Sequence, residues 1–174
     1  VLNTTEGWPA GIQLTSISMR TNSKNTLTID KMNPLQPLIT DFLLQEILDT
    51  LPSAIQDFLL RTSFLQSLEP EVCNGLTNRT DSYTMLQELE KKGLFTVRLN
   101  SSQPVFRYHH LFAEALQMEL KNRYTQEVIS SIVLDTAKLL YAKGDFNAAI
   151  DLVFQERAFK LAESWITEHL VEIF

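Results

Sequence analysis

The sequence predicts a mainly α-helical chain that contains one small β-hairpin. Three observations lead to this prediction. Apolar residues recur at helical spacing through most of residues 40–94 and 124–173. Between these parts, residues 95–108 change to the alternation of a strand, interrupted by a polar turn at residues 100–104. The short sequence Lys143-Gly144-Asp145 joins two helical patterns, and so short a turn makes the two helices antiparallel neighbours.

Composition is that of a water-soluble globular protein. The chain has 174 residues, of which 44% are apolar, and this is enough for a packed core. No apolar run approaches the roughly 18 residues of a membrane span, so no membrane association is expected. The N-terminal residues do not read as a signal peptide, and the single cysteine, Cys73, has no partner for an internal disulfide. We therefore expect a reducing, cytoplasmic location.

Charge is distributed unevenly along the chain. Residues 41–100 and residues 124–174 each carry a net charge of −4, whereas residues 101–123 carry +1. A surface that neutralises many nucleic-acid phosphates requires the opposite balance. We therefore expect no direct nucleic-acid binding by this chain.

The first 40 residues divide into a helix and a linker. Pro9 suits the first helical position, where its missing N–H costs nothing, and a helix should follow to about Arg20. Residues 21–40 are rich in Asn, Ser and Pro, which favour turns. The linker predicts a boundary, and the chain divides into residues 1–33, 34–123 and 124–174.

Four helices are predicted between residues 40 and 93. Thr40 can cap the first, which ends near Thr50, and Pro52 begins the second. The third covers Glu69–Leu76, where Cys73 is interpreted as a small buried residue. Asp81 is expected to cap the fourth helix, and Gly93 supplies the left-handed residue that ends it.

Helices, a hairpin and a further helix follow one another in the order of a winged-helix domain. The helix that starts near His109 should direct its apolar side chains inward: Phe112, Ala115, Leu116 and Leu120. After residue 124 the pattern is helical throughout: one helix ends at Lys143-Gly144, Asp145 is expected to cap the next, and a third covers Phe159–Ile173. The segment Leu139–Ile150 resembles a tetratricopeptide-type helical pair. Because one repeat cannot bury both of its faces, the chain is expected to be the start of a longer α-solenoid.

One stretch, Arg107–Phe112, lies where the second strand gives way to a helix. The first N–H groups of a helix lack intrahelical partners and attract anions, so a histidine there could help to bind phosphate. The alternative is that Tyr108, Leu111 and Phe112 belong to the core and that His109 and His110 cap the helix. Spacing alone favours this second interpretation, since a His-His pair has no specific ligand geometry.

Four motifs occur in a characteristic order: Glu6–Leu14 (EGWPAGIQL), Phe58–Ser63 (FLLRTS), Leu86–Phe95 (LQELEKKGLF) and Arg107–Phe112 (RYHHLF). Together they resemble the MalT-type large ATP-binding regulators of the LuxR superfamily, which are bacterial signal-transducing STAND ATPases. The resemblance covers nearly the whole chain, although the last fifty residues match only as generic helical repeat.

This resemblance implies a piece from the middle of such a regulator. In the family, a P-loop ATPase domain precedes the G-x-P helix, a winged-helix domain and a superhelical sensor follow it, and a LuxR-type DNA-binding domain ends the chain. This sequence has no G-x-x-x-x-G-K-[ST] motif. We therefore expect the chain not to be an enzyme and to have no catalytic residue, while ATP or ADP with Mg²⁺ would bind the full-length protein.

Three nucleotide-binding residues are implied by the resemblance. Gly7 and Pro9 match the G-x-P element, whose proline packs on the adenine ring. His109 matches the histidine of the Met-His-Asp motif of related NB-ARC domains, which contacts the β-phosphate of ADP. Here Tyr108 replaces the methionine, and His110 replaces the aspartate, so the acidic residue of the motif is missing.

The implied function is to couple the nucleotide state of the P-loop domain to an inducer, a small molecule or a protein, that binds the helical repeat. Activation would produce a homo-oligomer. Two other classes stay open, a free-standing winged-helix DNA-binding repressor and a helical-repeat interaction scaffold. A metal enzyme using His109, His110 and Cys73 is the weakest alternative, because adjacent histidines cannot readily face one ion, and no metal site is expected.

Overall fold

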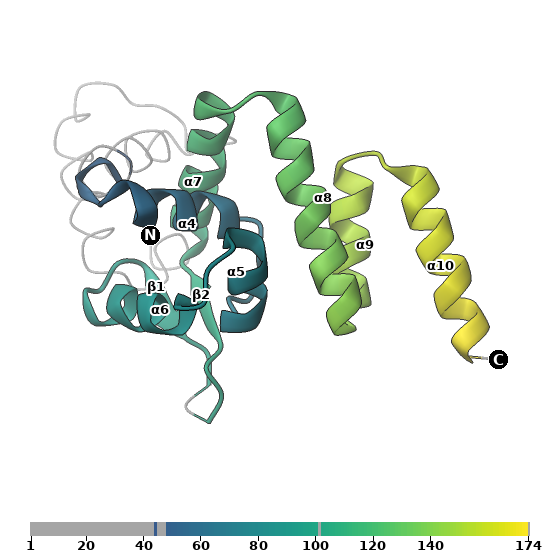
Figure 1. Cartoon of the computed structure of the whole chain (residues 1–174), viewed down its shortest axis with the longest axis horizontal. Helices are drawn as coiled ribbons and strands as arrows, with labels where there is room; N and C mark the ends of the chain where they lie inside the picture. Colours follow the sequence, from purple (N-terminus) through teal and green to yellow (C-terminus); the bar gives the residue numbers. More distant parts are fainter. Residues whose placement is uncertain (1–43, 45–47, 101, 174) are drawn as a thin grey trace, which may run out of the picture.

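The computed structural model describes residue 44 and residues 48–100 and 102–173. The helix expected from Pro9, the linker over residues 21–40 and the Thr40 cap lie outside these residues. The described part is mainly helical, with one two-stranded antiparallel sheet, as predicted. In Figure 1, α4, α5, α6, the hairpin and α7 form one part, which we call the first lobe, and α8, α9 and α10 continue side by side beyond it.

The first lobe is built around buried faces of two short helices. α4 (Ser53–Thr62) begins after Pro52 and buries Phe58, Leu59 and Leu60. α5 (Pro70–Thr77) has its proline in the first turn and buries Val72, Cys73 and Leu76. In α5 the three buried residues share one helical face, and Cys73 is buried as predicted, whereas α4 buries Leu60 beside Phe58 and Leu59 and so has a wider buried face.

α6 (Ser82–Lys91) buries Leu86 and Leu89, and it is followed by Gly93 at a φ of +65°, the predicted left-handed residue. Asp81 is the N-cap residue of α6, as predicted, but its side chain forms no capping hydrogen bond. Its carboxylate accepts two hydrogen bonds from Arg79, and the N–H of Ser82 donates to Asn74 Oδ1 at 3.1 Å instead. A side chain from α5 therefore helps to satisfy the start of α6.

The hairpin pairs β1 (Thr96–Arg98) with β2 (Phe106–Tyr108), in the register Thr96↔Tyr108, Val97↔Arg107 and Arg98↔Phe106. The other edge of β2 is paired by Leu68 through two backbone hydrogen bonds to Phe106. Val97 and Leu99, the apolar members of the alternation, are about half exposed, whereas Thr96 is buried. The alternation therefore predicts the strand, and the tertiary contacts decide which face is covered.

α7 (His110–Arg123) passes through the core of the first lobe, and its buried residues include Phe112, Ala115, Leu116 and Leu120, as predicted. α8 (Gln126–Lys143) follows after a short connection and ends at Gly144, whose φ is +89°. α9 (Phe146–Gln155) begins at Asp145, whose carboxylate accepts from the N–H of Ala148 at 3.3 Å. The predicted Asp145 cap is thus confirmed, and α9 turns back along α8.

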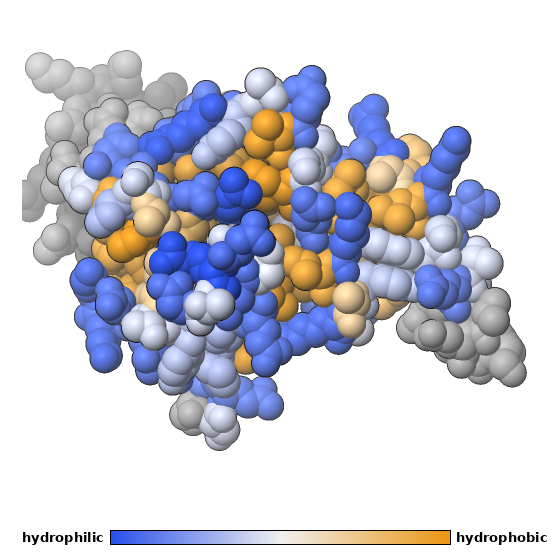
Figure 2. Space-filling model, viewed as in Figure 1, coloured by the Kyte–Doolittle hydropathy of each residue, from blue (hydrophilic) through white to orange (hydrophobic). Residues whose placement is uncertain are grey.

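The last helix, α10 (Phe159–Ile173), packs against α9 and has the predicted bounds. Trp165 of α10 stacks on Tyr141 of α8, with ring centroids 4.3 Å apart. Figure 2 shows apolar surface along the line between α7 and α8 and again between α9 and α10, broken by hydrophilic side chains. None of the helices within the described residues has both the length and the apolar character needed to cross a bilayer.

Candidate functional site

The candidate site is the junction between β2 and α7, which we call the β2–α7 junction and which comprises residues 107–112. β2 ends at Tyr108, and His109 is the N-cap of α7, with extended backbone angles. The ring of His109 accepts a hydrogen bond at Nδ1 from the N–H of Leu111, at 3.3 Å. This bond requires an unprotonated Nδ1, so the neutral ring carries its hydrogen on Nε2. His109 is therefore a capping residue whose second nitrogen is a donor.

The two histidines differ in their surroundings. His109 is buried, at 9% exposure, whereas His110 is half-buried and is the first helical residue, so it does not cap the helix. Their rings stack with centroids 4.6 Å apart. Tyr108, Leu111 and Phe112 are all buried, which confirms that they belong to the core. Of the two interpretations made from the sequence, capping is confirmed for His109 and is wrong for His110.

Phe95 fixes the backbone of His109. Its carbonyl accepts from the N–H of His109 at 2.7 Å, and its ring lies 5.0 Å from that of Phe112. Phe95 has a φ of +52°, a left-handed conformation that costs a bulky residue about 1–3 kcal/mol. The sequence predicted an ordinary strand from Phe95, but β1 begins only at Thr96. Because aromatic residues rarely adopt this conformation, the alternating pattern did not predict it.

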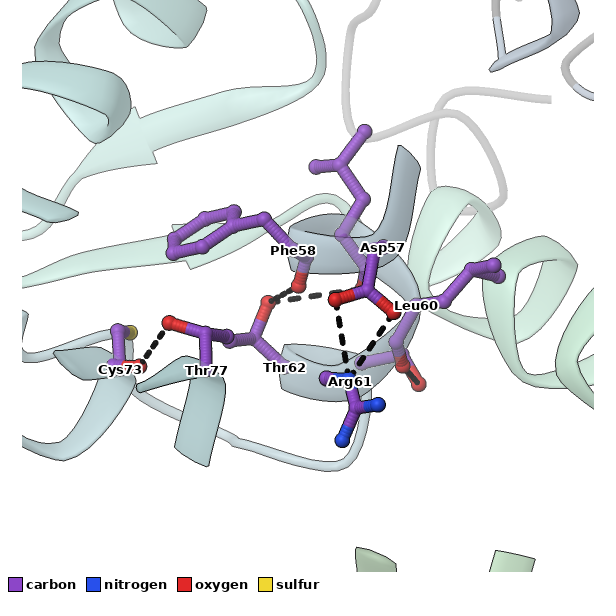
Figure 3. Close-up of polar contacts among 9 residues, drawn as sticks. Asp57, Phe58, Leu60, Arg61, Thr62, Cys73 and Thr77 are labelled. Atoms are coloured by element: carbon purple, nitrogen blue, oxygen red, sulfur yellow. Dashed lines mark hydrogen bonds and ion pairs between the residues drawn. The ribbon is translucent and has the colours of Figure 1, made fainter. Parts of the chain in front are cut away.

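Tyr108 is hydrogen-bonded to α4. Its hydroxyl lies 2.8 Å from Thr62 Oγ1, which in turn donates to the carbonyl of Phe58 at 2.7 Å. Figure 3 shows the hydroxyl of Thr62 directed at the Phe58 carbonyl, one turn earlier in the helix. Since the hydrogen of Thr62 is used in this way, Tyr108 is the donor to Thr62. Burial raises the pKa of Tyr108 far above its ordinary value, so the phenol stays neutral.

Three of the four sequence motifs meet at the β2–α7 junction. Thr62 belongs to the Phe58–Ser63 motif and Phe95 ends the Leu86–Phe95 motif, and both bond to Arg107–Phe112. In addition, Gln117 of α7 donates to the carbonyl of Ser63 at 2.8 Å. The motif Glu6–Leu14, with Gly7 and Pro9, lies outside the described residues. The nucleotide-binding roles of Gly7, Pro9 and His109 stay predictions.

Positive charge in the first lobe is largely neutralised by nearby carboxylates. Ion pairs hold the following arginines: Arg61 with Asp57, Arg79 with Asp81, Arg98 with Glu90, and Arg123 with Asp49 and Glu119. The guanidinium of Arg98, on the hairpin, also lies 4.6 Å from the ring centroid of Phe106. Arginines that are paired with carboxylates attract phosphates less strongly, and this argues against the DNA-binding alternative.

A second feature, the α5–α8 joint, links the first lobe to the helices that follow. A Cβ atom placed on Gly75 of α5 would lie 3.2 Å from both δ-carbons of Leu139 in α8. The absence of a side chain at Gly75 therefore allows the close approach of the two helices. Lys143, at the end of α8, also forms an ion pair with Glu69, which precedes α5.

Within the described residues, no group of three or more His, Cys, Asp or Glu side chains could hold a metal ion.

Comparison with known proteins identifies relatives of the first lobe and of the chain. A family model described as the MalT winged helix domain matches residues 44–128. The HTH-type transcriptional regulator MalT of Vibrio campbellii is 32% identical over 126 residues, which are 70% of this chain and 14% of that protein. MalT of Yersinia pestis is 35% identical over 114 residues, which are 64% of this chain and 13% of that protein.

Another relative is similar over a larger share of the chain. The serine/threonine-protein kinase PknK of Mycobacterium tuberculosis is 27% identical over 164 residues, which are 87% of this chain and 15% of that protein. The chain spans between 13% and 15% of the length of these curated relatives. The order of helices and hairpin described above agrees with the family match, and residues 44–128 belong to the MalT winged helix domain family.

Proposed function

We propose that this chain is the regulatory middle part of a MalT-type, ATP-dependent bacterial transcriptional regulator. In this proposal it couples the nucleotide state of a P-loop domain to a helical-repeat sensor that begins with α8. The single observation that carries the proposal is the match of residues 44–128 to the MalT winged helix domain. The similarity to MalT of two organisms supports the regulatory role.

The β2–α7 junction would be the point where the winged helix senses nucleotide. His109 uses Nδ1 to cap α7, so Nε2–H is the donor that could reach a phosphate oxygen of ADP. The positive end of the α7 dipole favours an anion at the same place. Gly7 and Pro9 would contribute to the adenine side of this site. Mg²⁺ and the rest of the phosphate cradle would come from the P-loop domain.

A rigid surrounding makes such a sensor effective. His109 is bonded through its backbone to Phe95, and its neighbour Tyr108 is bonded to Thr62. A contact between ADP and His109 would therefore restrain the whole first lobe and not only a mobile loop. The α5–α8 joint would pass the same constraint to the helical repeat. ADP would thus favour one arrangement of the regulator, and an inducer bound to the repeat would favour another.

Full-length partners follow from the same proposal. They are a P-loop domain before the winged helix, a small-molecule or protein inducer on a tetratricopeptide-like repeat, and a LuxR-type DNA-binding domain. The activated protein would be a cytoplasmic homo-oligomer with bound ATP. The chain described here would have no catalytic residue of its own.

Two substitutions of His109 in the full-length protein separate sensing from capping. Asparagine is among the best N-cap residues, so His109→Asn should preserve α7 but lose the imidazole Nε2–H. His109→Ala should lose both. We expect both variants to bind ADP more weakly and to raise basal transcription, while Met118→Ala, a control at an exposed position farther along α7, changes neither. If only His109→Ala differs from wild type, His109 is a capping residue and the sensing role is wrong.

A further inference from the structure

A groove of about 580 Å³ lies between the first lobe and α9. The first lobe contributes Phe64, from the connection after α4, and Gln117, from α7. The facing wall is a stripe of α9 that includes Asp151, Leu152 and Gln155. This volume would hold several amino-acid side chains and lies within the range of known ligand sites.

One end of the groove is apolar and exposed. Phe154 lines it and is 47% exposed, and Phe159, at the start of α10, is 58% exposed. The two rings lie with their centroids 6.1 Å apart, so they form one continuous apolar surface. Adjacent exposed aromatic rings on a soluble domain often mark a contact surface for another protein.

The rest of the groove carries negative charge and amide groups. Among the described residues, Asp145 and Asp151 are the charged ones in its lining, which includes neither Lys nor Arg. Asp145 is already used to cap α9. Asp151 is exposed and forms no ion pair within the described residues. Gln117, which lines the groove, donates its amide N–H to the carbonyl of Ser63, so its amide oxygen remains an acceptor.

We propose that this groove binds a basic polypeptide segment. Such a segment would present a Lys or Arg to Asp151 and an aromatic or aliphatic side chain to Phe154, and its backbone N–H groups would donate to Gln117. Charge selects this occupant. A nucleic acid would bring phosphates to an acidic wall, and a second copy of the chain would bring another net charge of −6.

Selection from a random peptide library tests the proposal with the full chain. Phage-displayed 12-residue peptides would be selected on the immobilised chain, and the enriched peptides would be synthesised for affinity measurements. We expect them to combine Lys or Arg with an aromatic or aliphatic residue. Asp151→Lys should weaken their binding at least about tenfold, because a like charge would then face the peptide. Phe154→Ala should weaken it as well.

Glu163→Lys is the matched control, since it makes the same change in net charge at an exposed position of α10. It should alter the affinity much less than Asp151→Lys does. Both substitutions are at exposed positions, and unchanged thermal unfolding would establish that the variants are folded. Three results would overturn the proposal: enrichment of neutral or acidic peptides, no enrichment, or an equal loss of affinity in the two charge variants, which would indicate unspecific attraction.

Discussion

Tyr108 and Thr62, 46 residues apart in the sequence, are joined by a buried hydrogen bond of 2.8 Å between their hydroxyl groups. Thr62 passes the interaction on to the carbonyl of Phe58. The bond connects Tyr108, at the end of β2, to the last turn of α4. Tyr108 directly precedes His109, the residue that caps α7. The bond therefore fixes the β2–α7 junction against the rest of the winged helix.

Substitutions of Thr62 and Tyr108 should show how much this hydrogen bond contributes to the free energy of unfolding. Thr62→Val keeps the shape but leaves the buried Tyr108 hydroxyl without its acceptor, so we expect the free energy of unfolding to fall by about 1–3 kcal/mol. Tyr108→Phe removes the donor and leaves the Thr62–Phe58 bond in place, which should cost about 0.5–1.5 kcal/mol. In the double variant the two losses should not add, because no unpaired hydroxyl remains. Urea unfolding measures all three, and additive losses would contradict the coupling.

The α5–α8 joint should tolerate little volume at Gly75. Gly75→Leu would push against Leu139, and we expect it to destabilise the chain by about 1–3 kcal/mol through overpacking. Adding Leu139→Ala makes space and should recover part of this loss, although Leu139→Ala alone is also destabilising. Thermal unfolding of the two single variants and the double variant tests this. If the double variant loses the sum of the single losses, the two residues are not in contact.

Alkaline pH should weaken the fold through Cys73. Burial raises the pKa of the Cys73 thiol to about 12, whereas an unfolded cysteine titrates near about 8.5. The folded thiol keeps its proton while the unfolded one loses it, so its contribution to stability is complete below pH of about 8.5. That contribution falls by up to about 1.4 kcal/mol for each pH unit between about 8.5 and 12.

Comparison of wild type with Cys73→Ala isolates this contribution from other groups that titrate in the same range. The variant is less stable at neutral pH, since a buried side chain is shortened, but its stability should fall less steeply above pH of about 8.5. Free energies of unfolding from urea titrations at several pH values provide the test. Parallel pH profiles of the two proteins would show that Cys73 is accessible and titrates normally.

Much of the helical structure could be predicted from local sequence. Spacing at 3.6 residues identified the buried face of α4, α5 and α7, and Gly144 and Asp145 gave the end of α8 and the cap of α9. These are contacts within one or two turns, and local chemistry decides them. The family resemblance, which rested on four short motifs, was confirmed by the match to residues 44–128.

Contacts between distant residues could not be predicted in this way. The carboxylate of Asp81 is taken by Arg79, and Asn74, eight residues before Ser82, accepts the N–H at the start of α6. Phe95 adopts its left-handed conformation where its carbonyl accepts from the N–H of His109, fourteen residues further along the chain. Spacing gave no indication of the bond from Thr62 to Tyr108 either. The Arg79–Asp81 pair is local, since the two residues are two apart and exposed, whereas the other features join residues eight or more apart in the sequence.

Contact between the β2–α7 junction and bound nucleotide in the full-length protein is the central element of the proposed function. Hydrogen–deuterium exchange of the peptide that covers residues 107–113, measured with and without ADP and Mg²⁺, tests this most directly. We expect ADP to slow exchange of its amides, because a ligand held by His109 would suppress local opening of the first turn of α7. Unchanged exchange in this peptide, at an ADP concentration that protects the P-loop domain, would contradict a nucleotide-sensing role for the winged helix.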